Sequence, residues 1–393
     1  MHPPLTAARR RAALFAVFAV QGVAFASWVT RTPGIRDAVR ASTSGMGLVL
    51  LGLSAGAMAG ILASPRLVAR RGARSVVLAG GLLQVLGVAT VAAGAGAGSA
   101  PVVAGGLALF GAGTGSAEIA VNVEGADVER ALGRSVLPVL HGCFSAGTCA
   151  GALAGVALTA ADVPVPVHLG AVALLLLVVV AAAVRSLPGG TGREPVRAHR
   201  TGPRPAVHRE RRVLLLAVLV LGMALAEGSA SDWLPLIVVD GFGLDASAGA
   251  LVYAVFGLAM ALGRVGGGPV VDRVGRVPVL RASAGLAAVG LLLVVLAPSA
   301  LLGALGVLCW GLGAALGFPL GVSAAGDEVE GATARVSFVA TGGYLAFLVG
   351  PPLLGFVGEE VGLRAAMLLV LAAVLVSGGA AAAARRPRPV PAA

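Results

Sequence analysis

The stretch Gly268-Pro-Val-Val-Asp272-Arg273-Val-Gly275-Arg276 shows how the chain is divided into apolar blocks and short charged segments. It is a short charged segment between two apolar blocks, at about residues 246–270 and 277–297. Each block has about the 20 residues that an α-helix needs to cross a hydrocarbon layer roughly 30 Å thick. Because glycine permits tight turns, we expect two membrane-spanning helices joined by a turn at this segment.

The composition of the whole chain agrees with a membrane protein. Hydrophobic residues make up 58% of the sequence and charged residues only 12%, whereas about a quarter of the residues in soluble domains are charged. The net charge of +11 does not indicate a nucleic-acid-binding protein, since the basic residues, all arginine, lie in short clusters between apolar blocks. Aromatic residues are only 4% of the chain, so we expect no platform on which bases would stack.

Ten further apolar blocks of similar length bring the expected number of spans to twelve. Buried strands are excluded, because a span must satisfy its own backbone hydrogen bonds in lipid. The other blocks lie at about 12–32, 44–65, 75–98, 101–123, 135–160, 164–185, 213–238, 299–323, 335–357 and 362–384.

Arginine placement predicts the orientation of these spans. With both termini in the cytoplasm, nearly all arginines fall on the cytoplasmic side, as the positive-inside rule requires. The opposite side receives only Arg31, Arg36, Arg40 and Arg364. We expect a multi-pass protein of a bacterial cytoplasmic membrane.

The chain divides into two halves that repeat one another. Residues 1–185 and 213–393 each hold six spans, and residues 186–212, rich in proline, glycine and arginine, form a solvated linker whose arginines can also meet lipid headgroups. Matched pairs are Trp28 with Trp233, Gly72 with Gly275, Gly125 with Gly326, Val128 with Val329, Glu129 with Glu330, Arg134 with Arg335, and Gly142 with Gly343.

The segment from Gly268 to Arg276 resembles a loop signature of the major facilitator superfamily, from which it departs at Val277. The resemblance implies two six-helix bundles around a central cavity, alternating access to that cavity, and a gating role for the loop. The corresponding segment of the first half, from Pro65 to Arg74, lacks the first glycine and the acid. Trp28, Arg31 and Pro33, with Asn122 to Gly125, are similar to a bacterial branch of this family that stands distantly near fucose-type proton symporters.

Polar residues inside the apolar blocks are the candidate site, because each is costly in lipid unless it faces a cavity or a partner. They are Gln21, Glu118, Asn122, His141, Glu227, Asp232 and Arg264. The blocks at 75–98, 164–185, 277–297 and 362–384, which the resemblance places on the outside, hold essentially none except Gln84. Glu118 is the first candidate for proton coupling or substrate contact, since a carboxyl group in a low-dielectric cavity can exchange protons near neutral pH. The alternative is that these acids form structural ion pairs.

Four charged residues flank the cytoplasmic turns and are candidate partners of the gating segment: Glu129, Arg134, Glu330 and Arg335. The alternative is that they are charges at helix ends in water. Arg264 either holds an anionic group of the substrate or forms an ion pair of the gate.

No enzyme motif is present. The sequence lacks GxxxxGK[ST], HExxH and CxxC, and Cys143, Cys149 and Cys309 lie inside apolar blocks. We expect no cofactor and no metal, and a monomer that takes up a small polar or sugar-like solute with protons. Two alternatives are proton-antiport export of drug-like compounds and a sensor that no longer transports.

Overall fold

The computed structural model describes residues 6–133, 136–193, 207–327 and 331–385, and all regular structure in these ranges is helical. Twelve of its segments are long and apolar enough to cross a membrane, which confirms the prediction of an all-α protein with twelve spans. By their internal contacts the helices form two compact units, Met1–His199 with Asp245–Leu251, and Arg200–Leu244 with Val252–Ala393. The linker predicted at 186–212 stays a prediction, because residues 194–206 lie outside the described ranges.

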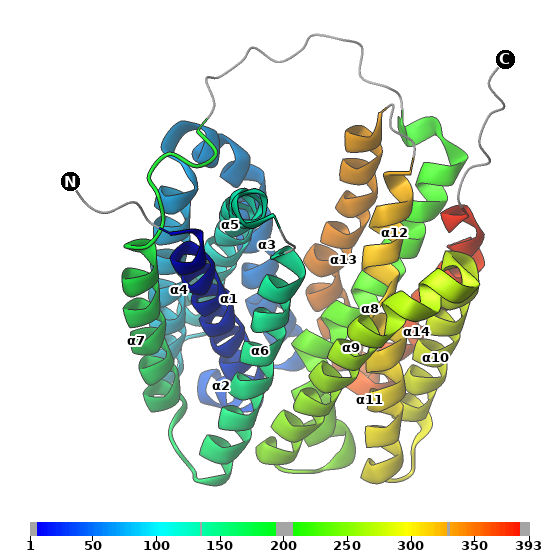
Figure 1. Ribbon diagram of the computed structural model, residues 1–393. Helices are drawn as coiled ribbons and strands as arrows, with labels where there is room; N and C mark the ends of the chain where they lie inside the picture. The colour runs from blue at the N-terminus through cyan, green and yellow to red at the C-terminus, as the bar shows by residue number, and fades with distance from the viewer. Residues whose placement is uncertain (1–5, 134–135, 194–206, 328–330, 386–393) are drawn as a thin grey trace, which may run out of the picture. The chain divides into compact units, whose positions relative to one another are not determined.

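The first unit contains six spanning helices and one short helix, which can be followed in Figure 1. They are α1 Ala7–Thr30, α2 Thr32–Val39, α3 Thr43–Arg71, α4 Ala73–Gly96, α5 Ala100–Leu132, α6 Leu137–Ala160 and α7 Val165–Val184.

The second unit contains the other six spans and begins with a short 3-10 turn. Its elements are η1 Val207–Arg209, α8 Arg211–Phe242, α9 Ala246–Val274, α10 Arg276–Leu296, α11 Ala300–Ala314, α12 Gly317–Ala325, α13 Ala332–Val361, α14 Leu363–Ala380 and η2 Ala381–Ala384.

The pairing of helices inside one unit is repeated inside the other. In the first unit α1 packs against α6 and α7, and α4 packs against α5 and α7. In the second unit α8 packs against α13 and α14, and α10 packs against α11 and α14. In both cases the first span meets the fifth and sixth, and the third meets the fourth and sixth. The repeat seen in the sequence is therefore also a repeat of tertiary contacts.

Glycine allows the closest of these contacts. A side chain at Gly147 or Gly151 of α6 would meet the backbone of Ala19 or Val23 on α1, and one at Gly56 of α3 would meet the backbone of Ala108 on α5. Membrane helices associate through such small residues because lipid gives no hydrophobic force that would drive them together.

The segment Gly268–Arg276 is mostly helix rather than loop, which corrects the expectation from sequence. Helix α9 continues to Val274, and the turn is confined to Gly275, whose φ of 85° only glycine adopts readily. The matched Gly72 has a φ of 82°. Polar residues after the apolar block continue the helix, because backbone bonding does not require an apolar side chain.

The short helix α2 follows α1 directly and was not anticipated from sequence, although Pro33 lies near its start, where proline is favoured. The described beginning of the predicted linker contacts the first unit, since Thr191 accepts a hydrogen bond from the backbone of Ala73 at 2.8 Å.

The fourth span of the second unit is broken between α11 and α12 at Ala315 and Leu316. Pro319 has no N–H to donate to the carbonyl of Ala315, four residues earlier, so that hydrogen bond of a continuous helix cannot form. In an apolar environment a carbonyl oxygen without a hydrogen-bond donor costs free energy unless another group donates to it.

Two glycines of α6 give a direct test of close packing. We expect Gly147→Ala to lower the free energy of unfolding by roughly 1–3 kcal/mol, because its methyl group would overlap the carbonyl oxygen of Ala19. Gly142→Ala is the matched control, since nothing lies within 4 Å of its added methyl group. Thermal unfolding in detergent measures both, and equal melting temperatures for the two variants would contradict this packing.

Candidate functional site

Two of the predicted site residues are joined by an ion pair in the second unit. Arg264 of α9 donates from Nη2 to Oε1 of Glu227 on α8 at 2.9 Å. Both side chains keep some exposure, 44% for Arg264 and 26% for Glu227. The pair is therefore reachable from outside the packed helices, and Arg264 is engaged here rather than with the segment after it.

The same arginine also reaches the broken helix. Nε of Arg264 donates to the carbonyl oxygen of Ala315 at 3.4 Å, which is the carbonyl that Pro319 leaves without its usual partner. A guanidinium group has five N–H donors and can serve a carboxylate and a carbonyl together. Arg264 thus ties α8 and α9 to the break between α11 and α12.

Buried aromatic residues hold this part of α8 in place. Trp310 of α11 is fully buried and donates from Nε1 to the carbonyl oxygen of Ala226 at 3.1 Å, directly before Glu227. Phe256 of α9 meets the Trp310 ring edge-on, with centroids 5.6 Å apart. These contacts fix the backbone that presents Glu227.

A second polar group lies one turn further along α8. The hydroxyl of Tyr253, on α9, lies near the side chains of Ser231 and Asp232. Asp232 is 6% exposed, and within the described residues it makes no hydrogen bond or ion pair. Sequence reasoning found Asp232 but missed Ser231 and Tyr253, because a lone hydroxyl in an apolar block carries no signal of its own.

The four candidates of the first unit do not form one cluster. Glu118 is exposed and Asn122 half-buried, one turn apart on α5, and neither has a side-chain hydrogen bond to the described part of the chain. Gln21 is buried on α1, with Nε2 unpartnered. His141 is exposed on α6 and packs edge-on against Phe18, with ring centroids 5.4 Å apart.

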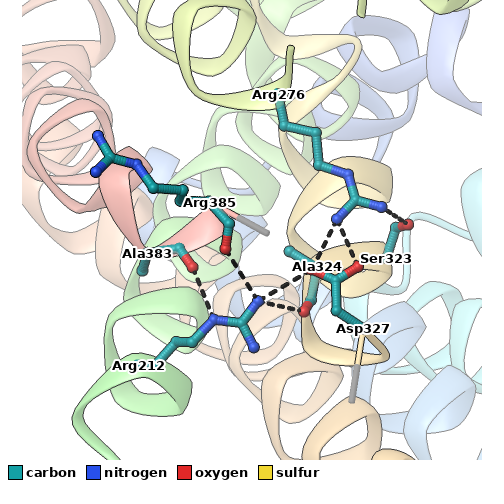
Figure 2. A network of polar contacts seen from close by, with 7 residues as sticks. All are labelled: Arg212, Arg276, Ser323, Ala324, Asp327, Ala383 and Arg385. Carbon is teal, nitrogen blue, oxygen red and sulfur yellow. Dashed lines mark hydrogen bonds and ion pairs between the residues drawn. The ribbon is translucent and has the colours of Figure 1, made fainter. Parts of the chain in front are cut away.

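Asp327 is the acid that pairs with the last residue of the signature segment (Figure 2). Arg276 donates from Nη1 to both carboxylate oxygens of Asp327, at 2.7 and 2.9 Å, and from Nη2 to Ser323. Arg212, at the start of α8, donates to Asp327 at 3.1 Å and to the carbonyl oxygens of Ala324 and Ala383. The carboxylate therefore joins the ends of α8, α10 and α12, which sequence reasoning did not anticipate.

The first unit has a related ion pair at the corresponding helix ends. Arg10 of α1 contacts Glu124 of α5 at 2.7 Å and also pairs with Asp127. In each unit an arginine near the start of the first span therefore binds acid at the end of the fourth span. In the first unit Arg10 binds two acids, whereas in the second unit Asp327 binds two arginines.

The predicted gating residues have varied surroundings. Gly268, Asp272 and Arg273 are exposed on α9, and their gating role stays a prediction. Glu129 accepts hydrogen bonds from the backbone of Val136 and Leu137 at 2.7 and 3.2 Å, so it caps the start of α6.

The remaining gate candidates pair elsewhere or cannot be placed. Arg335 of α13 binds Glu210 at 2.7 Å. Arg134 and Glu330 lie outside the described residues.

The expectation that the 164–185 block holds no polar side chain is wrong at His168. This residue lies on α7, is 3% exposed, and accepts a hydrogen bond at Nδ1 from Nε of Arg31 at 3.0 Å. The mean hydropathy of the 164–185 block stays high in spite of one histidine, because it is an average over the whole span.

The chemistry that this arrangement offers is binding and proton exchange. Carboxyl, hydroxyl, amide and guanidinium groups on the spans can hydrogen-bond a polar solute, and the carboxyl groups can exchange protons. Among the described residues no three His, Cys, Asp or Glu side chains gather to hold a metal ion.

Comparison with known proteins identifies relatives along most of the chain. The family model of the Major Facilitator Superfamily matches residues 126–339 and 251–393. An uncharacterized MFS-type transporter of Yersinia pestis is 30% identical over 89% of this chain and 89% of its own length. An uncharacterized transporter of Sinorhizobium fredii is 31% identical over 90% of this chain and 92% of its own.

Solved structures share the fold at low sequence identity. The nucleoside transporter NupG has a TM-score of 0.73 at 14% identity and covers 96% of this chain and 100% of its own. The fucose:proton symporter FucP of E. coli has a TM-score of 0.63 at 16% identity, with 96% and 98% covered.

The two ion-pair clusters at the helix ends predict unequal effects of removing one acid. We expect Asp327→Asn to lower the free energy of unfolding by roughly 1–3 kcal/mol, because it removes the carboxylate that two part-buried arginines, Arg212 and Arg276, share. Asp127→Asn is the matched change in the first unit and should cost less, since Glu124 still neutralises Arg10. Denaturation in detergent compares the two, and a larger loss for Asp127→Asn would refute this assignment.

Proposed function

Because the chain belongs to the major facilitator superfamily, we propose that it takes up a small polar solute together with protons by alternating access. The chain is a multi-pass membrane transporter and not an enzyme. Uptake, proton coupling, a bacterial cytoplasmic membrane, cytoplasmic termini and a monomeric state are parts of the proposal. A sugar-like molecule is the solute class that we favour.

The observation that carries the proposal is the polar group beside the broken helix. Glu227, Arg264 and the carbonyl of Ala315 lie together where α11 ends. Transporters commonly bind substrate at interrupted helices, because unwound backbone there offers hydrogen-bonding groups inside the membrane. A solute with several hydroxyl groups would find a carboxylate, a guanidinium group and a carbonyl within a short distance.

Two acids without cationic partners support proton coupling. Glu118 and Asp232 lie inside spans and form no ion pair with the described residues, whereas Glu227 has Arg264. A carboxylate in this environment is costly as an anion unless a cation or water stabilises it. Such a group is suited to bind a proton on one side of the membrane and to release it on the other.

Proteins of similar fold carry solutes of the proposed kind. The two solved structures are those of a nucleoside transporter and a fucose:proton symporter. Both solutes contain a sugar ring with several hydroxyl groups, so this fold accommodates them. The low sequence identities mean that the proposal depends on this chain's own polar residues.

A second candidate function, export of apolar compounds, is favoured by one cluster in the first unit. Phe18 and Phe144 meet edge-on with centroids 6.1 Å apart, and Phe25 lies 6.4 Å from Phe144. Phe25 and Phe144 are only half-buried, and exposed aromatic rings suit flat apolar molecules.

Proteoliposomes loaded with a pH-sensitive dye test the proposal. We expect solute pools containing sugars or nucleosides to acidify the interior, and Glu118→Gln and Asp232→Asn each to reduce that signal at least ~10-fold, because a neutral amide cannot carry a proton. Asp162→Asn is the matched control. It neutralises an exposed carboxylate at a turn outside the spans and should leave the signal unchanged.

Other outcomes of the same assay contradict parts of the proposal. Alkalinisation of the interior with drug-like compounds would replace uptake by export. A solute signal that survives both variants would remove these acids from the coupling step.

A further inference from the structure

A buried arginine at the end of α1 has no anionic partner. Arg31 follows Thr30 and is 6% exposed, and its one side-chain hydrogen bond within the described residues goes from Nε to Nδ1 of His168. Arginine has no acceptor atom, so Nδ1 carries no proton and His168 is neutral. Burial lowers the pKa of the Arg31 guanidinium, yet an ordinary value of about 12.5–13.8 keeps it charged.

The guanidinium also has an unused donor. Nη2 of Arg31 is buried from solvent and has no hydrogen-bond partner. Leaving a buried donor of a charged group unsatisfied costs roughly 1–3 kcal/mol or more, so this atom marks a place where an acceptor is missing. No Asp or Glu of the described residues pairs with Arg31.

Arg364 of the second unit shows how the fold satisfies a comparable arginine. Its guanidinium donates to the carbonyl oxygens of Val294, Gly241, Val295 and Ala297, at 2.6–3.2 Å. It also stacks 4.2 Å from the centre of the Phe242 ring. Helix C-termini carry partial negative charge, so Arg364 needs no ion, whereas Arg31 has only a neutral imidazole.

Neighbouring side chains add further unused donors. Ser27 and Trp28 lie four and three residues before Arg31, on adjoining parts of the same helix face. Both are buried, and neither Oγ of Ser27 nor Nε1 of Trp28 has a partner.

The repeat indicates that packing alone does not require this charge. Trp28 corresponds to Trp233 at an offset of 205 residues, and the same offset matches Arg31 with Leu236, which is fully buried. An apolar residue therefore fills the equivalent place in the second unit. The first unit holds a cation there instead, with several donors and no acid.

From this geometry we infer that the buried polar site formed by Arg31 and His168 binds a small inorganic anion of halide size, such as chloride. The anion accepts hydrogen bonds from Nη2 of Arg31 and neutralises the guanidinium inside the first unit. It is a structural ion of the helix bundle and is independent of the solute that the protein carries.

Thermal unfolding in detergent tests this inference. We expect the native protein, exchanged into gluconate buffer, to gain roughly 2–5 °C in melting temperature as chloride replaces gluconate at constant ionic strength, with saturation. His168→Asp places a carboxylate oxygen where Nδ1 stands, so it should raise stability in gluconate and abolish the chloride response. Arg31→Met should also abolish the response.

Arg364→Met is the matched control, since it removes an arginine that carbonyl groups already satisfy. It should lower the melting temperature in both buffers and leave the chloride shift unchanged. No saturable shift in the native protein, which would mean that water and not an anion meets Nη2 of Arg31, would overturn the inference. A full shift in His168→Asp would overturn it as well, even if Arg31→Met failed to fold.

Discussion

Within a hydrocarbon layer, backbone N–H and C=O groups have no water to bond, so each span must satisfy them within its own helix or through a side chain. The structure meets this constraint by forming its spans as helices, and the span made of α11 and α12 shows one place where a side chain supplies a missing donor. Pro319 removes a donor, the carbonyl of Ala315 is left over, and Arg264 reaches it from α9. The same arginine binds Glu227, so repair of the helix break and assembly of the polar site are one arrangement.

Charges outside the apolar layer follow a second rule, which both halves share. Arg10 and Arg212 each lie near the start of a first span and bind acids at the end of the fourth span. Such ion pairs join the ends of neighbouring helices beyond the apolar layer. Because the helix contacts of one half are repeated in the other, the joined ends belong to corresponding helices. The two halves differ at the proposed anion site, where the first half has Arg31 and the second half has the apolar Leu236 at the matched position.

Sequence alone was sufficient for the spans, the repeat and most polar positions, because hydropathy and matched residues such as Trp28 and Trp233 depend only on order along the chain. It failed on partners. The expected charge partners of the signature segment were Glu129, Arg134, Glu330 and Arg335, but Arg276 pairs with Asp327. Such a choice depends on how helices pack. It also failed at helix ends, since α9 continues beyond its apolar block, and at His168, a single polar residue that an apolar average conceals.

The central claim is that this protein moves a polar solute with the help of a proton gradient. The most direct measurement is accumulation of radiolabelled sugars and nucleosides by proteoliposomes with an imposed pH gradient, acidic outside. The account predicts accumulation above the external concentration, and its collapse when a protonophore is added. Accumulation that persists with the protonophore, or none from any pool by protein shown to be folded, would contradict the account.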